Sequence, residues 1–255
     1  MATAAISLAT LSAFAQRGPQ RVVSPPKAAA PIDLTGYWVS IITEDWRHRM
    51  LPAPLKGDYE SLPLTDEARK VADTWDPVKD EAAGNQCKAY GAPFIMHMPG
   101  RLHITLENDF TLRIDTDAGM QTRIFHFDGK PEQAGPPQWQ GYSVADWYWT
   151  PGWPGGNALA LADRSKGQGI FGRSLKVLTT HMRPGYLRKN GVPYSGNAVM
   201  TEYFNQFDTP NAASYLVVTS IIEDPQYLNQ PFVTAVHFRK QADATGWNPT
   251  PCTVK

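Results

Sequence analysis

The sequence predicts a mainly antiparallel, all-β domain that closes, or nearly closes, into a barrel and carries one short helix. From residue 101 onward, short segments alternate apolar and polar side chains at period two, with turn residues between them. No strand–helix–strand alternation is visible, which argues against a parallel sheet. Roughly nine or ten antiparallel strands would have one face to bury, and closing the sheet removes its edges.

The first strand is expected at residues 33–42, where β-branched and aromatic residues follow an aspartate. Directly after it, residues 44–49 form a densely polar run around Trp46. Two acidic and two basic side chains belong to this run: Glu44, Asp45, Arg47 and His48. Because strand ends place functional groups at barrel mouths, the run is a candidate site. The alternative is a surface cluster of ion pairs.

A single substantial helix is predicted from Thr65. Threonine is a good N-cap, and the two acids that follow it complement the helix dipole. Apolar residues at positions 68, 71, 72 and 75 form one stripe, and Pro77 ends the helix. Residues 76–100 are expected to be an ordered loop.

The remaining strands follow from period-two patterns. A β-meander is predicted over residues 101–127, two further strands at 157–162 and 174–181, and three long strands close the chain. These last three are expected at residues 197–207, 214–223 and 231–240. Asn190-Gly191 is a tight-turn signal.

The start of the chain predicts export. Residues 1–15 are apolar and small and end in the A-x-A pattern Ala13-Phe14-Ala15, which is typical of a secretory signal peptide. Proline-rich residues 16–31 are interpreted as a flexible leader, and residues 32–255 as a single barrel domain. The predicted location is therefore periplasmic or secreted. No other stretch approaches the roughly 18 apolar residues that cross a bilayer, so no membrane insertion is expected.

Charge and cysteine content restrict the partners. The 24 basic and 24 acidic side chains cancel, which argues against nucleic acid as a partner. In an oxidising compartment the two cysteines, Cys87 and Cys252, predict a disulfide that ties the C-terminal tail to the loop around Cys87. The alternative is two buried free thiols. A homodimer is left open.

Gly36-Tyr37-Trp38 on the first strand resembles the G-x-W motif of lipocalins. The resemblance implies a lipocalin/calycin-like barrel in which Trp38 plugs one end. It also implies that an arginine of the last strand, here Arg239, packs over that tryptophan by cation–π stacking. The match covers only the two ends of the chain.

Several longer stretches are similar to a group of exported, poorly characterised bacterial β-barrel proteins. They are Asp33-Leu-Thr-Gly-Tyr-Trp-Val-Ser, Thr43-Glu-Asp-Trp-Arg, Asp117-Ala-Gly-Met-Gln-Thr-Arg-Ile-Phe-His-Phe, Leu187-Arg-Lys-Asn-Gly-Val-Pro-Tyr, Thr201-Glu-Tyr-Phe and Glu223-Asp-Pro-Gln-Tyr-Leu-Asn-Gln-Pro-Phe, which together cover most of the mature chain. This resemblance implies export and a soluble β-fold. It leaves the reaction open.

Three polar residues on strand faces that look buried are the candidate acid–base groups: His126, His181 and Glu202. A buried carboxylate is costly unless it is paired, and a buried histidine is a common proton carrier. A His–Glu pair meeting inside the barrel would form a proton-transfer dyad. Taken alone, each residue is better explained by a structural role. Arg123 and His126 lie on opposite faces of their strand, so one of them points inward.

A second group is predicted to bind the substrate. It contains cationic, acidic and aromatic side chains from the polar run, from the strand at 121–127, from the last strand and from the aromatic segment 142–153. Its members are Arg123, Arg47, Glu44, Trp46, Tyr142, Trp147, Trp149, Trp153 and His237. Amphipathic aromatic residues favour barrel mouths, so segment 142–153 is interpreted as a lid or platform for a flat ligand.

Familiar cofactor and nucleophile motifs are missing from the sequence. There is no Gly-rich phosphate loop, Rossmann fingerprint or G-x-S-x-G elbow. No metal-ligand spacing such as H-x-H or H-E-x-x-H occurs, so neither a metal site nor a cofactor is predicted. A cupin-like site of His126, His181, His237 and Glu202 remains the metal alternative.

The leading hypothesis is a periplasmic, cofactor-independent lyase or isomerase that moves a proton on an apolar, aromatic small molecule. One alternative is a lipocalin-like protein that binds a small molecule without catalysis. The other is a metal-dependent β-barrel oxygenase or hydrolase. The sequence leaves the substrate and the direction of reaction undetermined.

Overall fold

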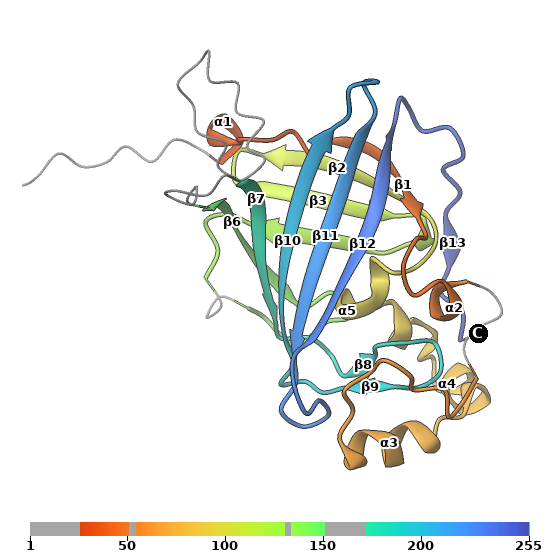
Figure 1. Ribbon diagram of the computed structural model, residues 1–255. Coiled ribbons are helices and arrows are strands. Elements are labelled where there is room, and N and C mark those ends of the chain that lie inside the picture. Colours follow the sequence, from red (N-terminus) through yellow and green to blue (C-terminus); the bar gives the residue numbers. More distant parts are fainter. Residues whose placement is uncertain (1–25, 51–54, 131–133, 151–171, 255) are drawn as a thin grey trace, which may run out of the picture.

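The computed structural model describes residues 26–50, 55–130, 134–150 and 172–254, and these form a closed β-barrel (Figure 1). The barrel strands are β1 (Gly36–Ile41), β2 (Arg101–Asn108), β3 (Thr111–Thr116), β5 (Thr122–His126), β6 (Tyr142–Thr150), β7 (Gly172–Thr180), β10 (Val199–Asp208), β11 (Ser214–Glu223) and β12 (Phe232–Gln241). The predicted class, a mainly β closed barrel, is confirmed.

The order around the barrel is β1-β12-β11-β10-β7-β6-β5-β3-β2, and β1 closes the ring by pairing with β2. Every neighbouring pair is antiparallel except β5 and β6, which run parallel. The connection between these two strands, residues 127–141, is long enough to return the chain to the end of the barrel from which β5 started. The aromatic segment that was interpreted as a lid is strand β6 of the wall up to residue 150.

Short elements gather at the ends of the barrel. The helical elements are α1 (Pro26–Ala29), α2 (Trp46–Arg49), α3 (Asp66–Asp73), α4 (Pro77–Ala82), η1 (Gln86–Tyr90) and α5 (Ala92–Ile95). The short strands are β4 (Ala118–Gly119), β8 (Gly185–Tyr186), β9 (Pro193–Tyr194) and β13 (Thr250–Pro251). In Figure 1, α3, α4 and the β8–β9 pair lie below one end of the barrel, and α1 lies at the opposite end. No described helix has the length and apolar character needed to span a membrane.

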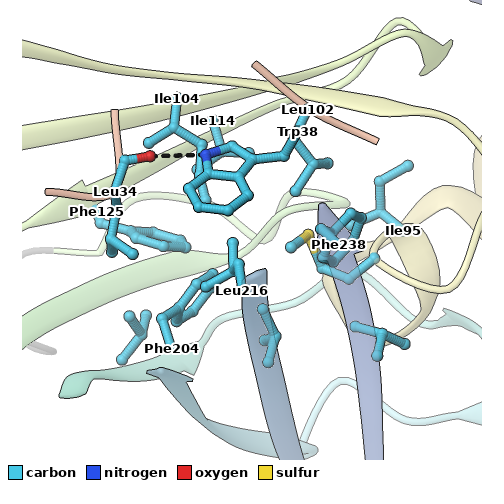
Figure 2. Packing of buried hydrophobic residues seen from close by; sticks show 14 of the residues in the cluster. Leu34, Trp38, Ile95, Leu102, Ile104, Ile114, Phe125, Phe204, Leu216 and Phe238 are labelled. Carbon is cyan, nitrogen blue, oxygen red and sulfur yellow. Dashed lines mark hydrogen bonds between the residues drawn. The ribbon is translucent and has the colours of Figure 1, made fainter. Parts of the chain in front are cut away.

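Side chains of the barrel wall fill its interior. Figure 2 shows Trp38 at the centre of this core, with its indole nitrogen donating to the Leu34 carbonyl oxygen at 2.9 Å. Phe125, Phe204 and Phe238 pack below it, and each of these side chains is at most 1 % exposed. Burying one such side chain contributes about 1.5–3 kcal/mol, so this packed centre is a major stabilising feature.

Trp38 is completely buried in the barrel interior, but the cation over its ring is not the predicted one. Lys240, not Arg239, places its charge over the indole ring, at 5.3 Å from the centroid. The register explains the exchange, because Trp38 pairs with Lys240 and alternation then turns Arg239 outward to an exposed position.

The predicted helix is α3, and Thr65 caps it by accepting a hydrogen bond from the backbone amide of Ala68. Residues 76–100 were expected to be a loop, but they contain α4, η1 and α5. The reason is local: Asp76 caps α4 by accepting from two amides, and Pro77 occupies the first turn, where it favours a helix start. Pro77 thus starts one helix where it was expected only to end another.

Both chain ends of the described part are attached to the barrel. Cys87 and Cys252 form the predicted disulfide, with their Cα atoms 5.1 Å apart. Residues 26–31 were assigned to a flexible leader with no core of its own, but the Pro26 carbonyl oxygen accepts a hydrogen bond from the Trp147 indole at 2.8 Å. The predicted signal segment 1–15, most of the leader and the predicted strand 157–162 lie outside the described residues.

Candidate functional site

Inside the barrel, Glu202 from β10 faces Arg123 from β5. The guanidinium donates two hydrogen bonds to the carboxylate, at 2.9 and 2.5 Å, and both side chains are completely buried. Arg123 also donates to the Thr179 hydroxyl at 3.4 Å. Sequence reasoning correctly predicted a buried Glu202 that needs a partner. The partner holds both carboxylate oxygens, so Glu202 is not positioned as a free base.

The two histidines proposed to accompany Glu202 lie elsewhere. Because Arg123 points inward, His126 points outward, where its ring stacks on Tyr142 with centroids 4.9 Å apart. His181 has φ 54°, which takes it out of the β7 alternation, and its side chain is exposed. The predicted His–Glu dyad and the alternative metal set of His126, His181, His237 and Glu202 are therefore not assembled among the described residues.

A different His–Glu pair forms on the outside of the barrel. His237 Nδ1 donates to Glu44 at 2.8 Å, and the other oxygen of Glu44 accepts a hydrogen bond from the buried Arg49. Arg49 also donates to the His97 carbonyl oxygen at 2.8 Å. His237 was placed on a buried face, and this is wrong: its neighbour on that face, Val233, is 59 % exposed.

In the rest of the polar run, Arg47 forms ion pairs. Arg47 reaches Asp58 at 2.9 Å and Glu60 at 2.6 Å, and Trp46 is 66 % exposed.

Two buried histidines lie in this region, His48 and His97. Burial is the main cause that lowers the pKa of His48 below its ordinary value, and it lowers the pKa of the fully enclosed His97 to about 3. Both imidazoles are therefore neutral at pH 7.

Of the predicted aromatic contacts, Trp147 lines a cavity of about 300 Å³ at the barrel end near α1. Its ring lies 5.4 Å from that of Phe127. Tyr142 is engaged with His126 on the outer face. The side chain of Trp149 and the whole of Trp153 lie outside the described residues.

A cleft of about 410 Å³ opens at the other barrel end, between α3, α4 and the β8–β9 pair. Its aromatic lining comes from Trp75, Tyr186, Tyr194 and Tyr227. Its volume lies within the range typical of small-molecule sites. The cleft therefore has both the size and the flat apolar walls that an aromatic ligand needs.

Three polar side chains form a closed network on the wall of this cleft. Lys88 donates to Asp80 at 3.0 Å, the Tyr186 hydroxyl donates to the other oxygen of Asp80 at 2.7 Å, and Lys88 approaches the Tyr186 oxygen at 3.3 Å. Burial, followed by the hydrogen bond to Asp80, raises the pKa of Tyr186 well above its ordinary value. Tyr186 is thus a protonated hydroxyl in direct contact with an ammonium group.

Glycines allow the elements around the cleft to approach closely. Gly191 has φ +83°, and a Cβ built on it would lie 2.2 Å from the Cβ of Trp75. A Cβ on Gly185 would lie 2.6 Å from the carbonyl oxygen of Lys88. Only glycine fits at these two positions, so the Asn190-Gly191 turn signal marked one wall of the cleft.

Sequence reasoning missed the cleft. Asp80 and Lys88 fell within a segment expected to be a loop, and Tyr186 is far from both in the chain. One signal was available: Lys88 directly follows Cys87, and the disulfide fixes that neighbourhood.

Comparison of the chain with models of protein families, with curated proteins and with solved structures gave no match. The similarity to an exported bacterial family therefore stays a prediction. The functional argument accordingly starts from the geometry of the cleft.

Proposed function

We propose that this protein is an exported enzyme that binds a small aromatic molecule in the cleft and transfers a proton on it, as a cofactor-independent lyase or isomerase. The observation that carries the proposal is the Asp80–Lys88–Tyr186 network on the wall of an aromatic-lined cleft of about 410 Å³. The proposal thus assigns proton transfer to residues at the end of the barrel, in place of His126, His181 and Glu202.

The lining supports an aromatic, uncharged substrate. Trp75, Tyr186 and Tyr227 offer flat surfaces on which a ring can stack. The charged residues that line the cleft are two lysines and two aspartates, Lys79, Lys88, Asp76 and Asp80, so they favour neither sign of charge. A phenol or aryl ether meets both conditions and carries an oxygen that can exchange a hydrogen bond with Tyr186.

The network supports proton transfer in a defined order. Before the substrate binds, Asp80 holds both partners in place by accepting from each. The Tyr186 hydroxyl then turns from Asp80 to the substrate and gives its proton to the reacting oxygen or carbon, and Lys88 supplies a proton to the tyrosine oxygen it already contacts. Lys88 is left neutral and recovers a proton from the substrate position that loses one, or from solvent.

Export is supported by the Cys87–Cys252 disulfide, since such bonds persist in oxidising compartments. The compartment is therefore part of the proposal. Fractionation of a bacterial host that expresses the full chain, with detection of the Cys87–Cys252 bond by mass spectrometry, tests it directly.

The test of function uses proton NMR in D₂O with a panel of phenols and aryl ethers. Wild-type protein should introduce deuterium into one of them or convert it to a product. Tyr186→Phe should lower this rate by about 10²–10⁴-fold, the usual contribution of a general acid. Tyr148→Phe is the matched control, because Tyr148 is an exposed tyrosine of β6.

One observation favours a second candidate, a binding protein without catalysis: Asp80 already engages both Lys88 and Tyr186. A ligand that binds the wild type and is weakened by Trp75→Ala, without exchange or turnover, would select this alternative. If no member of the panel binds, both candidates for the cleft are wrong.

A further inference from the structure

A second cluster of ligating groups lies outside the cleft, where α2 meets the loop of residues 55–62. His48 from α2 offers a ring nitrogen, and Asp58 and Glu60 each offer a carboxylate oxygen, with all three atoms within 4.8 Å of one another. Imidazole and carboxylate are ligands that Zn²⁺ accepts together.

His48 supplies an independent reason to expect a ligand here. The residue is only 7 % exposed, and its Nδ1 has no hydrogen-bond partner among the described residues. A buried ring nitrogen without a partner is unfavourable, because it has lost water and gained nothing in exchange. A metal ion bound at Nδ1 would supply the partner that this nitrogen lacks.

In the structure, Arg47 neutralises the two carboxylates. Its guanidinium bridges Asp58 and Glu60, but the side chain is 57 % exposed, so it can move into solvent. Exposed ion pairs of this kind are weak, and a divalent ion opposite two carboxylates is a stronger partner. The nearby Arg188 is offset by the charges of Asp45, Asp58 and Glu60.

We propose that His48, Asp58 and Glu60 form a Zn²⁺ site, which the ion occupies by displacing Arg47. Zinc–ligand bonds of about 2.0–2.2 Å require the three atoms to move together by about 1 Å. Glu60 can supply this movement, since its side chain is 67 % exposed.

The site would stabilise one wall of the cleft. The backbone oxygen of Asp58 accepts a hydrogen bond from the side-chain amide of Asn190 at 2.9 Å. The backbone oxygen of Glu60 accepts a hydrogen bond from the Arg188 guanidinium at 2.7 Å. Residues 188–190 lead directly into Gly191 and Pro193, which line the cleft. Fixing the loop to α2 would therefore hold this segment in place. The metal proposal does not depend on the proposed enzyme activity.

The experiment is calorimetric titration of ZnCl₂ into the metal-free full chain, with CaCl₂ as the comparison. One Zn²⁺ should bind per chain, and Ca²⁺ should bind at least tenfold more weakly. His48→Gln and Glu60→Gln should each weaken Zn²⁺ binding at least tenfold. Glu60→Gln guards against misfolding of the His48 variant, because Glu60 is on the surface. Visible absorption of a Co²⁺-loaded sample gives a second reading of nitrogen and oxygen ligation.

Matched controls are available in the chain. His126→Gln removes a histidine outside the site and should leave Zn²⁺ binding unchanged. Arg47→Gln should tighten binding at least threefold, whereas Arg113→Gln should not, although Arg113 also bridges two carboxylates, Glu107 and Asp115. The proposal is overturned if the wild type shows no saturable one-to-one binding, or if neither His48→Gln nor Glu60→Gln weakens it.

Discussion

Arg123 and Glu202 face each other inside the barrel through two hydrogen bonds of 2.9 and 2.5 Å, and neither side chain has any contact with solvent. The two residues come from strands that are not neighbours in the barrel. A buried ion pair of this kind is costly to break, because the remaining charge then has no partner.

Glu202→Gln should lower the free energy of unfolding by about 3–5 kcal/mol, since it leaves the Arg123 guanidinium uncompensated. The double variant Arg123→Met, Glu202→Leu should recover most of this loss. Urea denaturation of both proteins measures the difference, with Glu223→Gln as the exposed control. Equal stability of Glu202→Gln and wild type would contradict a native pair.

Stability should fall as the pH is lowered below about 6.5, in part because of His97. Burial lowers the pKa of His97 to about 3 in the folded protein, with Arg49 and Arg188 acting in the same direction. Between the folded and unfolded pKa values of His97, the unfolded state binds one more proton than the folded state. The free energy of unfolding therefore falls by up to about 1.4 kcal/mol for each pH unit of acidification in this range. The stability that neutral His97 contributes is fully present above its unfolded pKa and is lost as the pH falls.

Chemical denaturation between pH 7 and pH 4 measures this dependence. His97→Gln should have a shallower decline than wild type, whereas His181→Gln, which changes an exposed histidine, should follow the wild-type curve. Parallel curves for His97→Gln and wild type would show that His97 takes up its proton as readily in the folded as in the unfolded protein, which contradicts an enclosed, neutral His97.

Removing the disulfide should destabilise the fold strongly. The bond joins residues separated by 165 positions, and the chain-entropy model assigns a loop of this length about 5 kcal/mol. The double variant Cys87→Ser, Cys252→Ser should therefore unfold at a much lower urea concentration than wild type. Wild type unfolded in the presence of a reductant should resemble the variant, and a reductant should have no effect on the variant itself.

Gly191→Ala should be far more disruptive than Gly84→Ala. Both glycines have positive φ, but a Cβ on Gly191 would collide with Trp75, whereas a Cβ on Gly84 meets no atom within 4 Å. The expected losses in unfolding free energy are about 2–4 kcal/mol for Gly191→Ala and about 1 kcal/mol for Gly84→Ala. Similar losses for the two variants would mean that Trp75 moves aside freely.

Local patterns identified the barrel class, the Thr65 cap and the cysteine pair, because each depends on few residues or on chemistry shared by the whole chain. Local patterns did not predict which side chain points inward where a strand carries polar residues on both of its faces. His126 and Arg123 are one example, and the register of β5 with its neighbours was needed to turn Arg123 inward. His181 is another, since its positive φ cannot be read from alternation.

The sequence by itself determined that this chain forms strands with one apolar face, and that its two cysteines can pair as a disulfide. Period-two alternation depends on neighbouring residues and disulfide formation on the presence of two cysteines, so both can be predicted from the order of residues alone. Only the tertiary structure decided which polar groups meet. Asp80, Lys88 and Tyr186 come from α4, η1 and β8, and His237 meets Glu44 across the outside of the barrel. These encounters depend on how the elements pack, and packing joins residues that no sequence period connects.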